Sequence, residues 1–374
     1  IPENANSSVG CANSMLTLKA LNRALLARQM LLARERTTAL DAIKRLVGLQ
    51  AQQARPPFVG LWSRLEGFRR EDLTELLTSR KVVRATLMRA TLHLMSSDDY
   101  LAFRPVLQPM LSAGMKSVLQ ERANLPLDEI VASAREIFTR QPCTFTEVRG
   151  CLAKAFPAYD ERAMGYAVRT SLPLVCTPDS SVWSFSGDPL FTTAECWLGS
   201  GLSDSADART LVLRYLKAFG PATAADVQAW SGMQGLKPVL DSLRPQLVTW
   251  KDSRRREYFD LPDAPRPEED VPAPPRLIAG FDNLVLAHAD RSRIIADEYR
   301  PRIVTKNLQV LPTFLVDGFV AGTWKTEMTK GTATLTISPF QRLPKTTKTQ
   351  LLEEAENLIR FAEPEASKFA VRFE

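Results

Sequence analysis

Residues 206–261 read ADARTLVLRYLKAFGPATAADVQAWSGMQGLKPVLDSLRPQLVTWKDSRRREYFDL and contain the most complete structural pattern in the chain. Apolar residues recur at helical spacing until Gly220 and Pro221 break the pattern, and Ser231 and Gly232 end a second helix. A charged turn then separates two runs that are rich in β-forming residues. The pattern predicts three helices, at 206–219, 223–230 and 234–243, and two strands, at 246–250 and 256–261. Three helices followed by a two-stranded wing are typical of a winged-helix module.

Two earlier segments have a similar order of elements. The letters QPCTFTEV at 141–148 correspond position by position to GPATAADV at 220–227, which indicates tandem copies of one unit. The second copy predicts helices at 127–139, 147–156 and 160–170, and a hairpin of strands 174–177 and 182–186. The first copy predicts helices at 18–28, 37–47, 57–65 and 71–79, wing strands within 81–94, and a further helix leading into 113–122.

The C-terminal part of the chain has a different pattern. Residues 262–275 hold six prolines and several acids, which predicts an extended linker. Asp317 and Gly318 predict a hairpin turn. Strands are predicted at 276–281, 284–287, 303–306, 313–316, 319–325, 332–339 and 369–373, with a helix at 345–361. These elements predict a small antiparallel sheet or barrel.

The chain is therefore predicted to be α+β, with three tandem winged-helix modules followed by a small antiparallel β-barrel-like domain, C-shaped around a DNA channel. The predicted divisions are a disordered extension or cloning remnant at 1–14, winged helices at 15–126, 127–204 and 205–262, a linker at 263–275, and the barrel-like domain with its C-terminal helix at 276–374.

Charge points to nucleic acid as the partner. The 374 residues carry a net charge of +6, but residues 15–122 alone hold 18 Lys and Arg against 9 Asp and Glu, a balance of +9. Arginine dominates this segment and is suited to bidentate phosphate contacts. A solvated basic face is the alternative. No apolar run is long enough to span a membrane.

Cysteine and histidine usage argues against a metal site. The five cysteines form no CxxC pair, and the chain has only two histidines, His93 and His288. This inventory predicts no zinc site, no disulfide framework and no cofactor, and it favours a reducing cytoplasm.

The loop GLQAQQARPP at 48–57 follows one predicted helix and precedes another that begins with proline. Its two glutamines alone are a weak signal, because a Gln-x-Gln pair can simply cap neighbouring helices. The chain as a whole, however, resembles the AlkZ/YcaQ family of winged-helix DNA glycosylases. The matching features lie at 16–18, 21–23, 26–29, 89–94, 220–221, 230–232, 281–282, 290–293, 316–318 and 322–324.

The resemblance implies a specific chemistry. Gln50-Ala51-Gln52 matches the Gln-aliphatic-Gln branch of the family, whose members unhook crosslinks and excise bulky N7-guanine adducts, several of them for antibiotic self-resistance. The implied activity is hydrolysis of the N-glycosidic bond of N7-alkylated purines, including bulky adducts and, by extension, interstrand crosslinks, for DNA repair or self-resistance. The implied enzyme is a monofunctional bacterial glycosylase without lyase activity, acting as a monomer on double-stranded DNA at the nucleoid.

Two neutral amides suit such a substrate. Alkylation at N7 makes the purine cationic, so the base leaves as a neutral molecule with little need of a general acid. A glutamine amide does not titrate, but it can accept a hydrogen bond from water and donate another. Gln50 and Gln52 are therefore predicted to be catalytic, orienting a water for attack at C1′. The loop offers no compact aromatic pocket, so the lesion is expected to stay in or near the stack.

Cationic and polar side chains are predicted to contact DNA at three places. Near the loop these are Arg55, Arg84, Arg89 and His93; at the wing turn, Arg254, Arg255 and Arg256; and in a predicted hairpin tip, His288, Arg291 and Arg293. A structural role for the histidines and a solvated surface for the arginines are the alternatives. At the level of the whole protein, the alternatives are a non-catalytic winged-helix DNA-binding protein or transcription regulator, and an assembly module whose winged helices bind protein.

Overall fold

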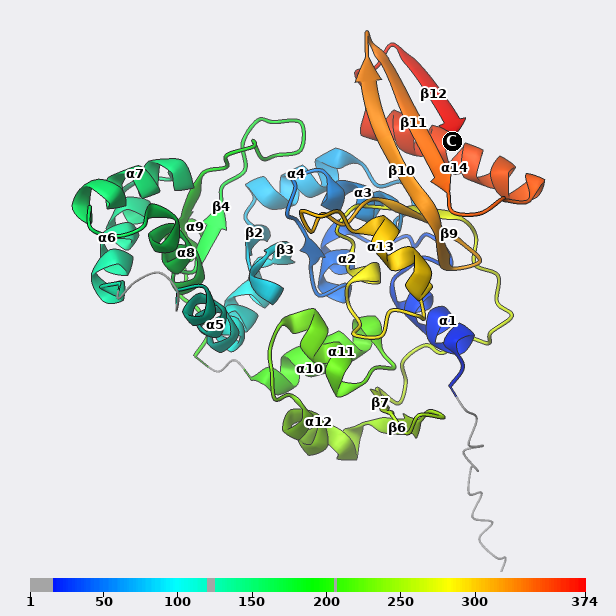
Figure 1. Ribbon diagram of the computed structural model, residues 1–374, viewed down its shortest axis with the longest axis horizontal. Coiled ribbons are helices and arrows are strands. Elements are labelled where there is room, and N and C mark those ends of the chain that lie inside the picture. The colour runs from blue at the N-terminus through cyan, green and yellow to red at the C-terminus, as the bar shows by residue number, and fades with distance from the viewer. Residues whose placement is uncertain (1–15, 120–124, 205–206) are drawn as a thin grey trace, which may run out of the picture.

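The computed structural model describes residues 16–119, 125–204 and 207–374 as a mixed α+β fold (Figure 1). The extension predicted at 1–14 lies outside these residues, as does the end of the helix predicted to reach 122. Figure 1 shows helices α6–α8 at one end of the molecule and the long strands β10–β12 with helix α14 projecting at another.

The N-terminal part contains four short helices, three strands and the long helix α5. Its elements are α1 (Leu18–Arg28), α2 (Ala39–Arg45), β1 (Leu49–Gln50), α3 (Pro56–Trp62), α4 (Arg70–Thr78), β2 (Val82–Thr86), η1 (Met88–Ala90), β3 (Leu92–Ser96) and α5 (Ser97–Leu119). Thr17 and Thr38 begin α1 and α2, because each hydroxyl accepts a hydrogen bond from a backbone N–H of the first turn. Pro56 opens α3, where its missing N–H costs no helical hydrogen bond.

The next part joins the same sheet as the first. It contains α6 (Leu127–Arg140), α7 (Phe145–Ala155), α8 (Glu161–Ser171), β4 (Leu174–Cys176), β5 (Phe191–Thr193) and α9 (Ala194–Leu198). Strand β4 pairs with both β2 and β5, which gives one five-stranded sheet in the order β1-β3-β2-β4-β5. The first two predicted modules therefore share one sheet.

The hairpin predicted between 174–177 and 182–186 is wrong. Residues 182–186 form no strand, and β4 pairs instead with β5 further along the chain. The physical reason is Asp179, whose carboxylate accepts from the backbone N–H groups of Ser181 and Ser186 at 2.8 Å each. These bonds close a compact surface loop and leave no extended segment there.

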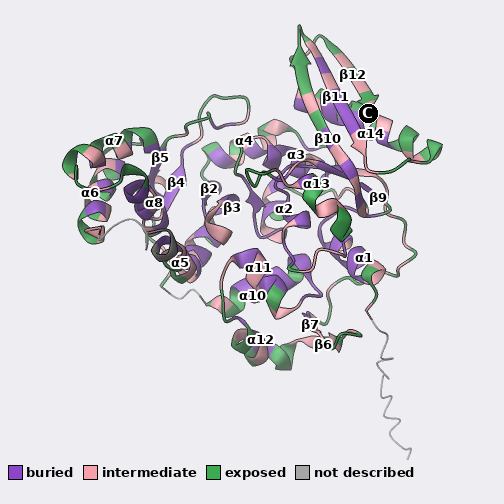
Figure 2. Cartoon of the chain, in the orientation of Figure 1, coloured by how far each residue is buried: buried purple, intermediate pink, exposed green. Residues whose placement is uncertain are grey.

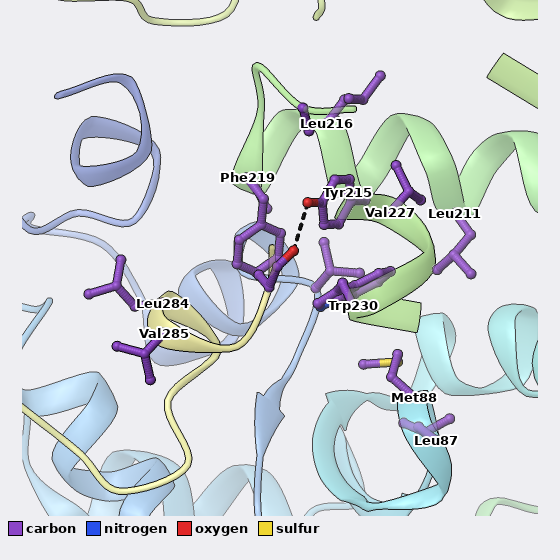
Figure 3. Close-up of a cluster of buried hydrophobic side chains, with 14 of the residues drawn as sticks. Leu87, Met88, Leu211, Tyr215, Leu216, Phe219, Val227, Trp230, Leu284 and Val285 are labelled. Carbon is purple, nitrogen blue, oxygen red and sulfur yellow. Dashed lines mark hydrogen bonds between the residues drawn. The ribbon is translucent and has the colours of Figure 1, made fainter. Parts of the chain in front are cut away.

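Residues 208–260 form the three helices and two strands that their sequence predicts. They are α10 (Ala208–Phe219), α11 (Ala224–Ser231), α12 (Lys237–Leu243), η2 (Arg244–Gln246) and the antiparallel pair β6 (Val248–Lys251) and β7 (Glu257–Asp260). Thr223 and Asp226 form a capping box that begins α11. Figure 3 shows Tyr215, Phe219 and Trp230 from these helices packed together, with Leu87 and Met88 beside them.

The C-terminal part is an open sheet and not a barrel. Its elements are β8 (Arg276–Ile278), η3 (Asn283–Val285), η4 (Asp297–Tyr299), α13 (Arg300–Ile303), β9 (Thr313–Val316), β10 (Phe319–Thr329), β11 (Thr332–Pro339), α14 (Lys345–Ala362) and β12 (Lys368–Phe373). The sheet order is β12-β11-β10-β9-β8, so β8 and β12 lie at opposite edges and do not meet. Helix α14 carries the chain back so that β12 runs parallel to β11.

Two strands predicted in this part are also wrong. Residues 284–287 begin in the 3₁₀ turn η3, because the Asp282 carboxylate accepts from the backbone N–H of Leu284 at 2.9 Å. Residues 303–306 begin with the last residue of the short helix α13, which Pro301 favours at its start. Both apolar runs are short, and length alone does not separate a strand from a buried turn.

Helix α1 ties distant parts of the chain together through buried polar groups. Arg28 forms a bidentate ion pair with Asp260 at 2.7 Å, with both side chains buried. Arg23 donates to the backbone oxygen of Val271 in the proline-rich segment at 2.7 Å, and Asn22 donates to the oxygen of Gly318 at 2.8 Å. Figure 2 shows buried residues concentrated in the middle of the molecule, with α6, α7 and the tip of β10 largely exposed.

Candidate active site

The loop after α2 is fixed to the sheet by its backbone. Gly48 has a φ of +89°, and a Cβ at this position would come within 2.8 Å of the Leu94 carbonyl oxygen, so only glycine fits without strain. Strand β1 then pairs with β3, which places Gln50 opposite His93. The Ala51 N–H donates to the Leu92 oxygen at 2.7 Å. The backbone of the loop therefore has a defined position against β3.

Arg84 supports the loop from within the protein. Its Nε donates to the Ala51 oxygen at 2.9 Å and its Nη2 to the Gln52 oxygen at 3.3 Å. The side chain is buried, and this burial lowers the pKa of Arg84. Arg84 was predicted to contact DNA, but in this position it offers no surface to a phosphate. It instead holds the backbone of residues 48–57, which we call the glutamine loop.

The two glutamines lie in different environments. Gln50 is 7% exposed, and its Oε1 accepts from Nη2 of Arg89 at 2.7 Å. Gln52 is exposed, and its Oε1 accepts from the backbone N–H of Leu92 at 3.3 Å. The Gln50 amide is thus buried, whereas the Gln52 amide is exposed.

Arg89, which is half-buried, and His93, which is fully buried, lie beside Gln50. The Arg89 guanidinium donates to the Asn283 Oδ1 at 3.1 Å and to the backbone oxygen of Trp230. Burial, followed by the nearby positive charge of Arg291, lowers the pKa of Arg89 to about 10. Arg89 was predicted to contact DNA, and the structure places its charged group among protein oxygens instead.

His93 is fully buried and neutral at physiological pH. Burial, followed by the positive charge of Arg89, lowers the pKa of His93 to about 3. Its Nδ1 lies 3.1 Å from the Thr91 carbonyl oxygen, an acceptor, so we assign the ring proton to Nδ1. The Nε2 lone pair then faces Arg89 at 3.5 Å. This environment fits the structural alternative for His93 better than DNA contact.

His288 and Arg293, also predicted to contact DNA, are buried too. His288 donates from Nε2 to the Phe219 oxygen at 3.0 Å, and burial lowers the pKa of His288 to about 3. Arg293 donates to the Pro221 oxygen at 2.7 Å and lies 3.7 Å from the carboxylate of Asp226. Both side chains connect the C-terminal part to α10 and α11, and neither has a face available for a phosphate.

The other predicted cations divide between paired and available groups. Arg256 pairs with Asp252 at 2.7 Å and with Asp290, so its charge is compensated within the protein. Arg254 and Arg255 are exposed at the turn between β6 and β7. Among the described residues, the buried Nε of Arg291 has no hydrogen-bond partner. Arg254 and Arg255 therefore keep charge available for a ligand, whereas Arg291 is half-buried.

Arg55 lies at the far end of the loop, next to a cavity. It pairs with Glu363 at 2.8 Å, and its guanidinium lies over the Trp183 ring at 5.5 Å. The cavity has a volume of about 320 Å³. Loop residues and C-terminal residues line it together, among them Gln53, Arg55, Pro56, Phe281, Val310, Thr323 and Trp324. Neither Gln50 nor Gln52 lines the cavity. Gln53, the next residue after Gln52, does line it, so the cavity adjoins the glutamine pair.

Sequence reasoning missed this cavity because its walls come from distant parts of the chain. Residues 279–281, 309–312 and 323–326 meet the loop only through the fold. In the part of the chain that the structure describes, no group of three His, Cys, Asp or Glu residues is placed to hold a metal ion. Across the same residues, no helix is both long and apolar enough to cross a bilayer.

Comparison with known proteins identifies the family. A model of the DNA glycosylase AlkZ-like family matches residues 43–361. The chain belongs to the AlkZ-like DNA glycosylase family. It is also similar to an interstrand DNA cross-link repair glycosylase of Streptomyces sahachiroi, with 25% identity over 351 residues that cover 85% of this chain and 90% of that protein. The family resemblance seen in the sequence is thereby confirmed.

A solved structure of another protein has a similar fold. The DNA glycosylase AlkZ of Streptomyces sahachiroi matches this glycosylase with a TM-score of 0.77, covering 96% of this chain and all of that chain at 22% sequence identity. The similarity of fold therefore extends over nearly the whole chain.

Proposed function

We propose that this glycosylase hydrolyses the N-glycosidic bond of N7-alkylated purines in double-stranded DNA, with Gln50 and Gln52 at the reaction centre. The observation that carries the proposal is the pair of neutral amides on a rigid loop, one buried against Arg89 and one exposed. In a DNA glycosylase, an exposed amide on a fixed backbone is suited to hold a water molecule near C1′.

The groups around these amides favour a cationic leaving base. A neutral lesion needs an acid to protonate the departing base, but His93, with a pKa of about 3, carries no proton to give at neutral pH. Arg89 keeps its proton, since its pKa is about 10. An N7-alkylated purine already carries positive charge and leaves without protonation. The site therefore matches a labile, charged substrate better than uracil.

The cavity beside the loop supports a substrate that includes bulky adducts. Its volume of about 320 Å³ is within the range of small-molecule sites, and Phe281 and Trp324 provide apolar surface. We propose that the substituent on the alkylated base occupies this cavity while the sugar lies at the amides. The name of the Streptomyces sahachiroi relative, an interstrand cross-link repair glycosylase, supports extending the substrates to crosslinks. The same reaction serves DNA repair and antibiotic self-resistance.

DNA binding is assigned to exposed cationic groups on several elements. The unit of α10–α12 with β6 and β7 has the element order of a winged helix, and Arg254 and Arg255 lie at its wing tip. We propose that this turn contacts phosphates on one side of a channel in which the duplex lies against the glutamine loop. Arg291 contributes a further contact. The enzyme acts as a monomer on the bacterial chromosome in the cytoplasm.

The test uses a duplex with one N7-methylguanine, and alkaline cleavage to reveal abasic sites. We expect the wild type to form abasic product and Gln52→Ala to lower the single-turnover rate about 100-fold, the order of magnitude for losing one transition-state contact. Gln350→Ala, an exposed glutamine on α14, is the matched control and keeps the full rate. A folded Gln52→Ala variant with the wild-type rate refutes the assignment.

The same experiment separates the enzyme from the transcription-regulator alternative. A regulator binds a specific operator sequence and produces no abasic site from any duplex. Duplexes with uracil and with unmodified guanine are included, and we expect little product from either because neither base carries the positive charge of the N7-alkylated one.

A further inference from the structure

We propose that Arg89 is a positioning residue that fixes the amide of Gln50 so that its Nε2–H₂ group faces the substrate. The inference rests on the proposed function and assigns Arg89 a role different from the phosphate contact that its charge suggested. It divides the work of the two amides: Gln50 acts as a hydrogen-bond donor, and Gln52 is the amide that can accept from the attacking water.

The orientation of Gln50 follows from the chemistry of its partner. A guanidinium group has five N–H donors and no acceptor, so the atom that faces it at 2.7 Å must be the amide oxygen. The Nε2–H₂ group then points away from Arg89. A partner able both to donate and to accept would leave this orientation open, as it usually is for glutamine.

Arg89 is itself held by three separate parts of the chain. Its Nη1 donates to the backbone oxygen of Trp230 at the end of α11, and its Nη2 donates to Oδ1 of Asn283 in η3 at 3.1 Å. His93 on β3 lies on a third side, with Nε2 at 3.5 Å. A lysine ammonium has the same charge but not the planar fork that reaches Gln50, Asn283 and Trp230 together.

The backbone at Arg89 is also specified. Its φ is +55°, and the neighbouring Ala90 has the same value, a conformation that costs free energy in residues other than glycine. Gly232 packs against it, since a Cβ on Gly232 would lie 3.1 Å from the Arg89 Cα. The tight turn η1 and the close approach of α11 thus place the guanidinium at Gln50.

The charge of Arg89 also makes the Nε2–H₂ group of Gln50 a stronger hydrogen-bond donor. Among the described residues no carboxylate forms an ion pair with Arg89, so its positive charge is balanced by the oxygens of Gln50, Asn283 and Trp230. In a buried site such a hydrogen bond polarises the amide and makes its N–H groups better donors. A donor of this kind suits an oxygen or ring nitrogen of the lesion nucleotide.

A double-mutant cycle on the excision rate tests the proposal. We expect Gln50→Ala and Arg89→Lys each to lower the single-turnover rate on N7-methylguanine DNA about 100-fold. Because Arg89 acts through Gln50, the double variant should be no slower than Gln50→Ala alone. Rates that fall by the product of the two single effects overturn the proposal.

DNA affinity separates this role from phosphate contact. Arg89→Met, which removes the charge, should bind the duplex as tightly as the wild type, with the same dependence on salt. A lost phosphate contact would instead reduce the slope of log K against log salt by about 0.9. That reduction, together with an unchanged rate for saturated enzyme, refutes the proposal. Arg36→Ala is the control, because Arg36 is exposed and pairs with Glu66 on the surface.

A second variant covers the case in which Arg89→Lys does not fold, as judged by its thermal unfolding. Asn283→Ala removes one acceptor of the guanidinium and leaves Arg89 in place. We expect it to lower the single-turnover excision rate about 10-fold, and to have no further effect on that rate in the Gln50→Ala variant. A loss that persists there overturns the proposal. A wild type that excises no base at all refutes the proposed function itself, a result distinct from either of these.

Discussion

Gln50 and Gln52 are two residues apart in the sequence, yet one amide is buried and the other is exposed. The end of β1 explains this difference: Gln50 is the last residue of the strand and lies opposite His93, whereas Gln52 follows the strand and does not share its buried face. Sequence alone predicted the pair only through the family resemblance. It did not show that Arg84 is buried and Arg89 half-buried among protein oxygens, because a positive charge in the sequence carries no information on the oxygens that will surround it.

The pH dependence of stability follows from the two buried histidines. Burial lowers the pKa of His93 and His288 to about 3, while the unfolded chain binds protons on them near the ordinary value of 6.5. The folded state therefore loses stability as the pH falls below about 6.5, by up to about 1.4 kcal/mol per pH unit for each histidine. Urea unfolding of the wild type at pH 7 and pH 5 measures the loss.

His288→Gln is the matched variant for this prediction. A glutamine can donate to the Phe219 oxygen as Nε2 of His288 does, but it does not titrate. The variant should lose less stability between pH 7 and pH 5 than the wild type. Equal losses in the two proteins would contradict the assignment of a buried, neutral His288.

At the scale of elements, local signals predicted the α10–α12 unit well. Thr223 and the Gly220-Pro221 break mark its helices in the sequence, and β6 and β7 form the expected hairpin. Elements that depend on distant partners were not predictable in this way. Strand β4 pairs with β2, which lies far from it in the sequence, and β12 pairs in parallel with β11 after an intervening helix. Neither pairing has a short-range signature in the sequence.

The entry into the glutamine loop depends on Gly48. We expect Gly48→Ala to destabilise the protein by roughly 1–3 kcal/mol, because a Cβ would meet the Leu94 oxygen at 2.8 Å in a backbone with φ of +89°. Chemical denaturation measures the loss, and excision should fall as well. Gly67→Ala has positive φ but no atom within 4 Å of its Cβ, so it should cost less. Equal losses in the two variants would show that the contact with β3 is unimportant.

The wing between β6 and β7 provides a second test at this scale. Replacing Arg254 and Arg255 by alanine should weaken binding to any duplex and lower the salt slope by about 1.8, at about 0.9 for each lost phosphate contact. Stability should stay near that of the wild type because both side chains are exposed. Fluorescence anisotropy at several salt concentrations measures the slope. An unchanged slope places the DNA elsewhere.

At the scale of the whole molecule, the site is assembled from segments far apart in the chain. Asn283 and Trp230 hold Arg89 at Gln50, and the loop meets residues 309–312 and 323–326 around the cavity. The family and the mixed fold class could be recognised from the sequence, whereas the cavity and the open C-terminal sheet could not. Their geometry depends on long-range packing that no local pattern specifies.

The cavity predicts a change in substrate range. Thr323→Trp places a large ring at a half-buried strand position that lines the cavity. We expect this variant to excise N7-methylguanine at the wild-type rate and a bulky aromatic N7-guanine adduct at least 10-fold more slowly. Thr323→Val, which keeps the volume of the side chain, is the control. Equal rates of Thr323→Trp on both substrates would show that the substituent lies elsewhere.

The central claim is that two neutral amides release a positively charged base. The most direct measurement is chromatography of the bases freed from a duplex that contains one N7-methylguanine, under single-turnover conditions, for the wild type and the Gln50→Ala, Gln52→Ala double variant. The wild type should release N7-methylguanine and leave an abasic site, and the folded double variant should release it no faster than DNA alone. Release at the wild-type rate by the double variant would contradict the claim.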